Sequence, residues 1–294
     1  MCPALQVRLV KRLSLLQLYQ EVNRKCLEVL WGWTMDGEAS LPQHVANLAR
    51  QRLLELAKSY PLRDDREALL LRCIPNLQSG KCVPESLEVM WAIINVLPAT
   101  AAPPAPSKAS IVSFLDSTAQ FLQLLVDDFA RYKAVARAAV EAHSTDGVPP
   151  TESEINGLVV AGYLEHEKQI QARLDFLERV LGVSSLKLLP AQINTLWHEL
   201  YDNGLTRRER DALLQWLTNA VKGRKKGTCF DLGAARDMFL SKICNPHADW
   251  SAASSALLRC FKAYFVYVWS RVNDRPRLTG CLCGAATLAS MMAG

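Results

Sequence analysis

Hydrophobic residues recur at intervals of three and four along most of the chain, which places them on one face of an α-helix. The pattern is clearest between residues 169 and 221, where three such stretches follow one another. Their apolar positions are Ile170, Leu174, Leu177 and Leu181, then Ile193, Leu196, Trp197 and Leu200, then Leu213, Trp216, Leu217, Ala220 and Val221. Helices this short cannot bury an apolar face alone, so we expect them to pack against neighbouring helices, with Trp197 in the core.

Helix boundaries in this region follow from capping residues. Pro190 suits the first turn of the second helix, because its missing N–H would have no partner there in any case. Thr206 and Glu209 predict a capping box at the start of the third helix, and Thr151 and Glu154 predict another. We expect this last box to open a helix that runs on into the first of the three stretches.

The N-terminal part of the chain shows the same kind of pattern, punctuated by proline. Pro42 and Pro84 are placed to open helices, and Pro75 is expected to end a short one. From Ser110 a single helix is predicted to continue for several turns, as far as Ala142. No stretch alternates as a strand would, so the predicted fold is all-α, an armadillo/HEAT-like helical repeat superhelix.

A proline- and alanine-rich segment divides the chain. Proline removes backbone donors and favours extended structure, so residues 98–107 are predicted to form an exposed linker. We therefore expect an N-terminal helical block at 1–97 and an armadillo-like block at 108–274. Residues 275–294 lack a hydrophobic pattern and are expected to form a disordered tail.

The charge distribution bears on the kind of partner. The net charge of +5 over 294 residues is small, and charges of both signs are mixed along the chain, so we expect no binding to nucleic acid. One basic loop stands out. Its residues Lys222, Arg224, Lys225 and Lys226 are candidates for contact with an acidic partner. A nuclear-import signal and a solvated charged turn are the alternative interpretations of this loop.

The cysteines indicate a compartment and exclude a metal site. There are nine, at irregular spacings, which favours reduced thiols in the cytoplasm or the nucleus. Cys244 and His247 lie three residues apart, but Cys229 and Cys260 stand alone, whereas structural zinc sites use two close pairs. We therefore expect no metal and no cofactor. The most apolar run, from Phe261 to Trp269, is shorter than the roughly 20 residues of a membrane span.

Three segments of the chain resemble a known family. The segments Gln171–Leu177, Leu189–Leu200 and Arg208–Lys222 are similar to the armadillo-like helical region of the large fat-facets-type ubiquitin-specific proteases. The resemblance extends over residues 163–273. It implies a parent protein that removes ubiquitin with a cysteine protease domain, and helical arrays beside that domain that engage substrates and partners.

The residues needed for such catalysis are not recognisable in this chain. Cys82 comes nearest to a nucleophile, but it lacks the asparagine and aromatic neighbours of the family's cysteine box and is closely followed by Pro84. We leave open whether the chain is an enzyme. We expect a scaffold that binds other proteins, ubiquitinated substrates among them, without nucleic acid or membrane, in the cytoplasm and also the nucleus. The alternative is a helical-repeat adaptor unrelated to ubiquitin.

Overall fold

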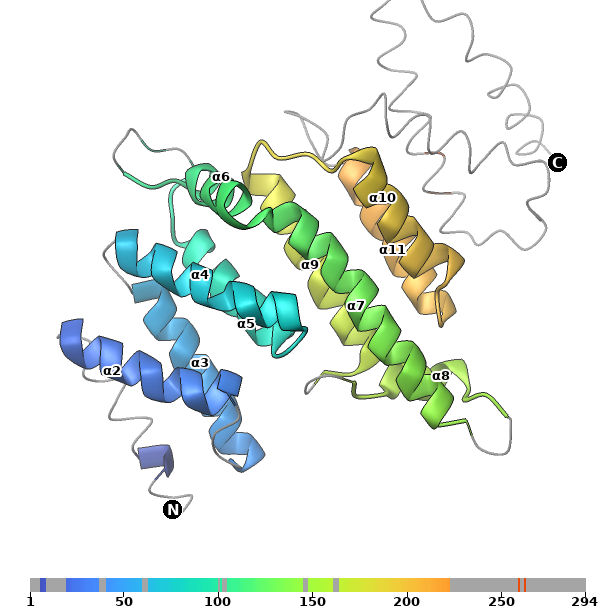
Figure 1. Ribbon diagram of the computed structural model, residues 1–294, viewed down its shortest axis with the longest axis horizontal. Coiled ribbons are helices and arrows are strands. Elements are labelled where there is room, and N and C mark those ends of the chain that lie inside the picture. The colour runs from blue at the N-terminus through green and yellow to red at the C-terminus, as the bar shows by residue number, and fades with distance from the viewer. Residues whose placement is uncertain are drawn as a thin grey trace, which may run out of the picture. The chain divides into compact units, whose positions relative to one another are not determined.

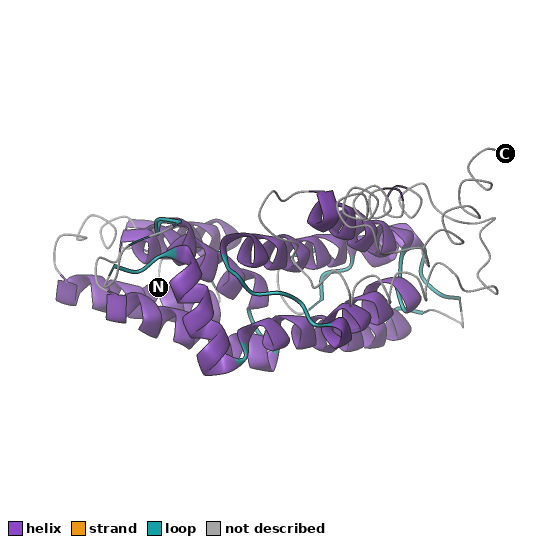
Figure 2. Cartoon of the chain, turned by 90° about the horizontal axis from the view of Figure 1, so that it is seen from above, coloured by secondary structure: helices purple, strands orange, loops and turns teal. Residues whose placement is uncertain are grey.

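The computed structural model describes residues 6–8, 20–36, 41–59, 63–99, 101, 105–144, 148–160, 164–222, 259 and 262. This part of the chain is helical and contains no β-strand (Figures 1 and 2). The helices are α2 (Gln20–Trp31), α3 (Gln43–Ser59), α4 (Arg63–Ser79), α5 (Val83–Asn95), α6 (Lys108–Ala119), α7 (Phe121–Ala142), α8 (Glu152–Gly157), α9 (His166–Val183), α10 (Pro190–Trp197) and α11 (Arg207–Lys222). The π-helical segments η1 (Gly32–Asp36) and η2 (His198–Asp202) extend α2 and α10. The predicted all-α class is confirmed.

The chain forms two compact units. One comprises residues 1–149 and 157–185, and the other comprises residues 150–156 and 186–294. Within the first unit, α4 and α5 contact α6, and α7 and α9 complete the packing. The helices on both sides of the predicted linker at 98–107 therefore belong to one unit, although the sequence suggested a boundary there.

Successive layers of helices build the first unit. Helix α3 packs on α5, α5 packs on α9, and α9 lies beside α7 (Figure 1). The apolar stripes meet in a core whose largest fully buried hydrophobic side chains come from four helices. These side chains are Leu30, Leu53, Leu56, Leu70, Leu77, Phe121 and Phe129. Burying each such side chain away from water stabilises the fold by about 1.5–3 kcal/mol. Helices this short depend on this contribution, because they are not stable without packing against neighbours.

The expected stop at Pro75 is wrong, because α4 continues through this proline to Ser79. Pro75 removes one backbone donor from the helix. Burial compensates for that loss, since Cys73 and Leu77 on either side are completely buried. Arg131 of α7 also donates a hydrogen bond to the Leu77 carbonyl at 2.7 Å. Tertiary packing therefore overrides the local preference at this proline.

The predicted single helix from Ser110 to Ala142 is also wrong, because it breaks at Gln120. This residue has a φ of +47°, which ends α6 and starts α7 in a new direction. The Asp116 carboxylate accepts a hydrogen bond from the Leu122 N–H at 3.0 Å and so caps α7.

The break also bears on whether α6 and α7 have the length and apolarity of a membrane-spanning helix. Among the described helices, no single one combines the length and apolarity of such a span. Of the described helices, only α6 and α7 taken together have that length and apolarity, and the chain bends by 68° between them.

The predicted capping box at Thr151 is present. The Glu154 N–H donates to the threonine hydroxyl at 3.4 Å, and the Thr151 N–H donates to the Glu154 carboxylate at 2.7 Å. The helix that it opens is α8, which ends at Gly157, and α9 starts separately at His166. The continuous helix expected from Thr151 into the region of Ile170 is therefore wrong.

In the second unit, α10 begins at Pro190 as predicted. The capping box at Thr206 forms with a shifted partner. The Thr206 hydroxyl accepts from the Glu209 N–H at 3.3 Å, but the Glu209 carboxylate accepts from the N–H of Leu205. The Thr206 hydroxyl also donates to the Asn156 side chain at 3.0 Å. This contact ties the start of α11 to α8.

Trp197 is part of the core of the second unit, as predicted. Its side chain is 3% exposed, and its indole N–H donates to the Asp202 carboxylate at 3.0 Å. The Tyr201 ring lies 4.4 Å from the Trp197 ring, between centroids. The indole thus fastens α10 to η2 through apolar contact and one hydrogen bond.

Replacing Trp197 with alanine should destabilise the chain by roughly 3–5 kcal/mol, the usual cost of truncating a core aromatic residue. Urea denaturation followed by circular dichroism measures this change. Leu189→Ala is a matched control, because Leu189 is 61% exposed and its truncation should cost little. Equal stability of the Trp197→Ala variant and the parent chain would contradict the core assignment.

Candidate functional site

The basic residues selected from the sequence are not tested by the structure. Lys222 is the last residue of α11, and its side chain lies outside the described residues. Arg224, Lys225 and Lys226 lie outside the described residues altogether. Their contact with an acidic partner therefore stays a prediction.

Cys82, the residue nearest to a nucleophile, and the buried His166 are held in structural contacts. Cys82 precedes α5 and is half-buried, and its thiol donates to the Met35 carbonyl at 3.1 Å. His166 is 1% exposed, and its Nδ1 lies 2.8 Å from the Tyr132 hydroxyl. The described part of the chain holds no group of three or more His, Cys, Asp and Glu side chains able to hold a metal ion. Cys229, Cys244, His247 and Cys260 lie outside that part or have undescribed side chains.

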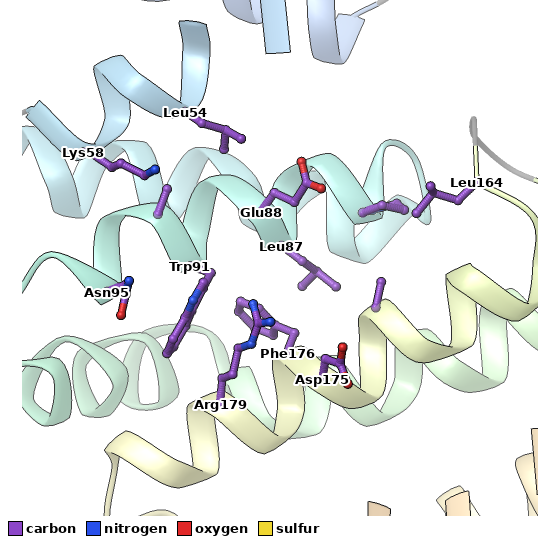
Figure 3. Close-up of a pocket in the computed structure, with 13 residues that line it drawn as sticks. Leu54, Lys58, Leu87, Glu88, Trp91, Asn95, Leu164, Asp175, Phe176 and Arg179 are labelled. Carbon is purple, nitrogen blue, oxygen red and sulfur yellow. The ribbon is translucent and has the colours of Figure 1, made fainter. Parts of the chain in front are cut away.

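Among the described residues, a groove in the first unit with a cavity volume of about 430 Å³ is a candidate site. Three helices and Leu164, two residues before α9, form it (Figure 3). The lining residues are Leu54 and Lys58 of α3, Pro84, Leu87, Glu88, Trp91, Ala92 and Asn95 of α5, Leu164, and Ala172, Asp175, Phe176 and Arg179 of α9. Helical periodicity explains the set, because the residues of α5 and α9 recur at intervals of three and four.

The groove has an apolar floor and a polar rim. Leu87 and Phe176 are 4% and 3% exposed and form the floor together with Ala92. Trp91 is half-buried and stands near one end, and the Arg179 guanidinium lies 5.5 Å from the centre of its ring. Figure 3 shows the side chains of Lys58 and Trp91 toward this end of the groove. An apolar surface edged by a few polar groups is typical of ligand sites.

The charged residues of the rim differ in how they are paired. Glu88 forms an ion pair with Arg50 at 3.6 Å, and Asp175 accepts a hydrogen bond from Gln171 at 2.6 Å. Burial raises the pKa of Glu88, and the Arg50 charge acts in the opposite direction. Lys58 and Arg179 have no carboxylate partner among the described residues. We call Lys58 and Arg179 the cationic pair of the groove.

A buried polar cluster behind the groove positions α9. Arg173 is 4% exposed, and its Nε donates to the Asp128 carboxylate of α7 at 2.6 Å. Its Nη1 donates to the Gln169 side chain at 2.6 Å, and its guanidinium lies 4.3 Å from the centre of the Tyr132 ring. A charge-assisted hydrogen bond between helices fixes their register more tightly than apolar contact alone. The α9 residues of the groove are therefore held by contacts on the opposite side of the helix.

A further buried acidic residue, Glu85, lies on α5. It is 7% exposed, and its Oε2 has no hydrogen-bond partner among the described residues. Burial raises the pKa of this carboxyl, while its own backbone N–H and the charges of Arg50 and Arg173 act to lower it. The positive charge of Arg173 thus faces acidic groups from both α5 and α7.

Sequence reasoning missed the groove. Trp91 continues the apolar spacing of α5, but the structure leaves it half-buried in the groove. Lys58 lies one turn after Leu54, and Arg179 lies three residues after Phe176. The sequence signal for the groove was a basic residue at the edge of an apolar stripe. The same pattern occurs on any solvated amphipathic helix, so it does not distinguish a site.

Arg173→Met should reduce the free energy of unfolding by roughly 3–5 kcal/mol, because it leaves the Asp128 carboxylate buried without its partner. Urea denaturation measures this loss. Adding Asp128→Leu to Arg173→Met should recover a large part of it, since the uncompensated charge is then removed. Lys168→Met is the matched control on α9, because its pair with Glu165 is exposed. A loss no greater than that of the control would contradict the role of the cluster.

Comparisons with known proteins agree with the all-α repeat architecture. A family model described as the UBP24/USP9X/USP9Y ARM repeat matches residues 5–269. The probable ubiquitin carboxyl-terminal hydrolase FAF of Drosophila melanogaster is 22% identical over 278 residues. The alignment covers 90% of this chain but only 9% of that relative. The resemblance found in the sequence is confirmed, and a helical repeat without relation to ubiquitin hydrolases is not supported. The chain belongs to the UBP24/USP9X/USP9Y ARM repeat family.

Proposed function

We propose that this chain is a non-catalytic helical scaffold segment that binds protein partners or substrates in ubiquitin removal. The observation that carries the proposal is the groove of the first unit, which combines an apolar floor with a cationic pair that has no carboxylate partner among the described residues. Family membership supports the link to ubiquitin removal, since the model's description and the relative's name both belong to ubiquitin hydrolases. The chain covers 9% of that relative, so the activity of the whole protein enters only as part of this proposal.

The shape of the groove favours a protein segment as ligand. Its volume of about 430 Å³ accommodates a few side chains, and its lining combines buried apolar residues with exposed and half-buried polar ones. Grooves between helices bind peptides by burying apolar anchors and pairing polar groups at the edge. We propose that the partners are proteins, ubiquitinated ones among them, without nucleic acid or membrane.

The chemistry of the described cysteines supports binding over catalysis and a reducing compartment. Cys26 and Cys73 form no disulfide among the described residues and are completely buried. Burial raises the pKa of the Cys73 thiol, which disfavours the reactive thiolate. Cys82 forms no disulfide with a described residue either, and its thiol donates a hydrogen bond to the Met35 carbonyl. We therefore propose a location in the cytoplasm, and also in the nucleus.

Capture of ubiquitinated proteins tests the proposal. The immobilised chain, incubated with cell extract in which cysteine proteases are inhibited, should retain ubiquitin conjugates, measured by immunoblotting against ubiquitin. Trp91→Ala should reduce the retained conjugates about tenfold, because truncating an aromatic anchor at a binding site costs at least ~1.4 kcal/mol. Leu189→Ala is the control, since this exposed side chain lies in the other unit. Retention no higher than on bare resin would contradict the proposed function, and equal retention by the Trp91→Ala variant would contradict the role of the groove.

A further inference from the structure

We propose that the groove lined by α3, α5 and α9 binds an extended peptide segment in which an acidic residue adjoins a bulky apolar residue. This inference rests on the proposed function and specifies the class of its ligand. Three features of the groove carry the proposal, namely the cationic pair, the apolar floor and the amide of Asn95.

The cationic pair selects an acidic side chain. Lys58 comes from α3 and Arg179 comes from α9, so the two cations approach the groove from opposite sides of α5 (Figure 3). Neither has a carboxylate partner among the described residues, whereas on the same rim Glu88 forms an ion pair with Arg50 and Asp175 accepts a hydrogen bond from Gln171. A ligand carboxylate would supply the missing charge and form charge-assisted hydrogen bonds. The Arg179 guanidinium lies over the Trp91 ring, which positions it at the groove.

The apolar floor selects the neighbouring residue. Leu54, Leu87 and Phe176 lie beyond Trp91 along the groove, away from Asn95 (Figure 3). A leucine, methionine or phenylalanine side chain placed here would leave water, which contributes about 1.5–3 kcal/mol for full burial. Because the cationic pair and the floor adjoin each other, the acidic and apolar residues of the ligand should be adjacent in its sequence.

Asn95 indicates that the ligand is extended. Its side-chain oxygen accepts a hydrogen bond from Lys108 Nζ at 3.2 Å, which orients the amide. Its amide N–H groups donate to no described residue. They can donate to a backbone carbonyl of the ligand, and an extended chain exposes such carbonyls, whereas a helix uses its carbonyls internally. The amide therefore favours an extended peptide over an amphipathic helix.

The remaining charges argue against a nucleic-acid ligand. A phosphate backbone carries charge at every nucleotide, so it would bring further negative charges close to Glu88 and Asp175. A peptide with a single acidic residue satisfies the cationic pair without that repulsion. Basic peptides are disfavoured by Lys58 and Arg179 themselves.

A peptide array tests the proposal with the full chain. The probe is a set of synthetic peptides in a Gly-Ser frame that carries every pair of amino acids at two adjacent central positions. The chain should bind best to pairs that combine Asp or Glu with Leu, Met or Phe. Affinities of the best peptides are then measured by fluorescence polarisation. Arg179→Gln should weaken them about tenfold, since a hydrogen bond to a charged group contributes ~1.5–3 kcal/mol.

Charge reversal separates ligand selection from a general effect on the fold. The double variant Lys58→Glu, Arg179→Glu should bind the acidic peptides at least tenfold more weakly and should prefer peptides with Lys or Arg in place of the acid. The control is Lys25→Glu, Lys81→Glu, which makes the same change of net charge at exposed positions away from the groove. It should bind as the parent chain does. Thermal denaturation verifies that each variant is folded, and the single Arg179→Gln variant decides if the reversal does not fold.

Two results would overturn the inference. One is that no peptide pair binds above the Gly-Ser frame alone, or that basic pairs bind best. The other is an unchanged preference in folded Arg179→Gln and charge-reversed variants. Neither result affects the capture of ubiquitin conjugates, which is measured on whole proteins. Capture without peptide selectivity would contradict this inference and leave the proposed function supported.

Discussion

The buried bond between Arg173 and Asp128 is the interaction on which the first unit depends. A guanidinium almost removed from water costs free energy unless its hydrogen bonds are satisfied, and Asp128 and Gln169 supply acceptors for it. Tyr132 adds its ring face. These groups come from α7 and α9, so the two helices can only pack in the register that brings them together. Apolar side chains alone would tolerate several registers.

The same register shapes the outer surface of α9. Arg173 points into the buried cluster, whereas Asp175 and Arg179 belong to the groove on α5. A shift of α9 by one turn would move Arg179 away from the Trp91 ring. The buried cluster and the groove are thus two faces of one helix. The cluster contributes specificity of packing, and the groove uses that specificity to hold two cations beside an apolar floor.

A comparable device operates in the second unit. Thr206 is almost completely buried, and its hydroxyl donates to the Asn156 side chain. The Glu152 carboxylate accepts from the Arg207 N–H at 3.0 Å, so α8 contributes to the first turn of α11. At the C-terminal end of α10, the Trp197 indole N–H donates a hydrogen bond to the Asp202 carboxylate of η2. In both units, buried apolar side chains supply most of the stabilisation, and a few polar contacts specify which helix ends meet.

Much of this architecture could be predicted from the sequence, because helical spacing, proline at Pro190 and the capping residues at Thr151 act locally. The failures occur where particular contacts, one distant in the sequence and others within a few residues, override the pattern read from the sequence. Pro75 stays helical because α7 covers its neighbours, and Gln120 breaks a helix because Asp116 caps the next one. At the start of α11, the Glu209 carboxylate accepts from the N–H of Leu205 instead of that of Thr206, so the predicted capping box is displaced by one residue.

The groove escaped prediction for a related reason. Lys58, Trp91 and Arg179 come from three helices, and their spacing within each helix is ordinary. Only the packing of α3, α5 and α9 brings them to one site. The boundary expected at 98–107 rested on composition, which says nothing about contacts between the helices on either side of it.

The most direct test of the account follows the indole N–H groups of the seven tryptophans by two-dimensional NMR. Substitution of Trp91 by phenylalanine assigns its signal, and the best-binding peptide from the array is then titrated into the parent chain. The account predicts that the Trp91 signal shifts progressively with peptide concentration, while the signals of Trp197 and Trp216, which are buried in the other unit, stay in place. A shift of the Trp197 or Trp216 signal with an unchanged Trp91 signal would contradict it, because the ligand would then bind elsewhere than in the groove.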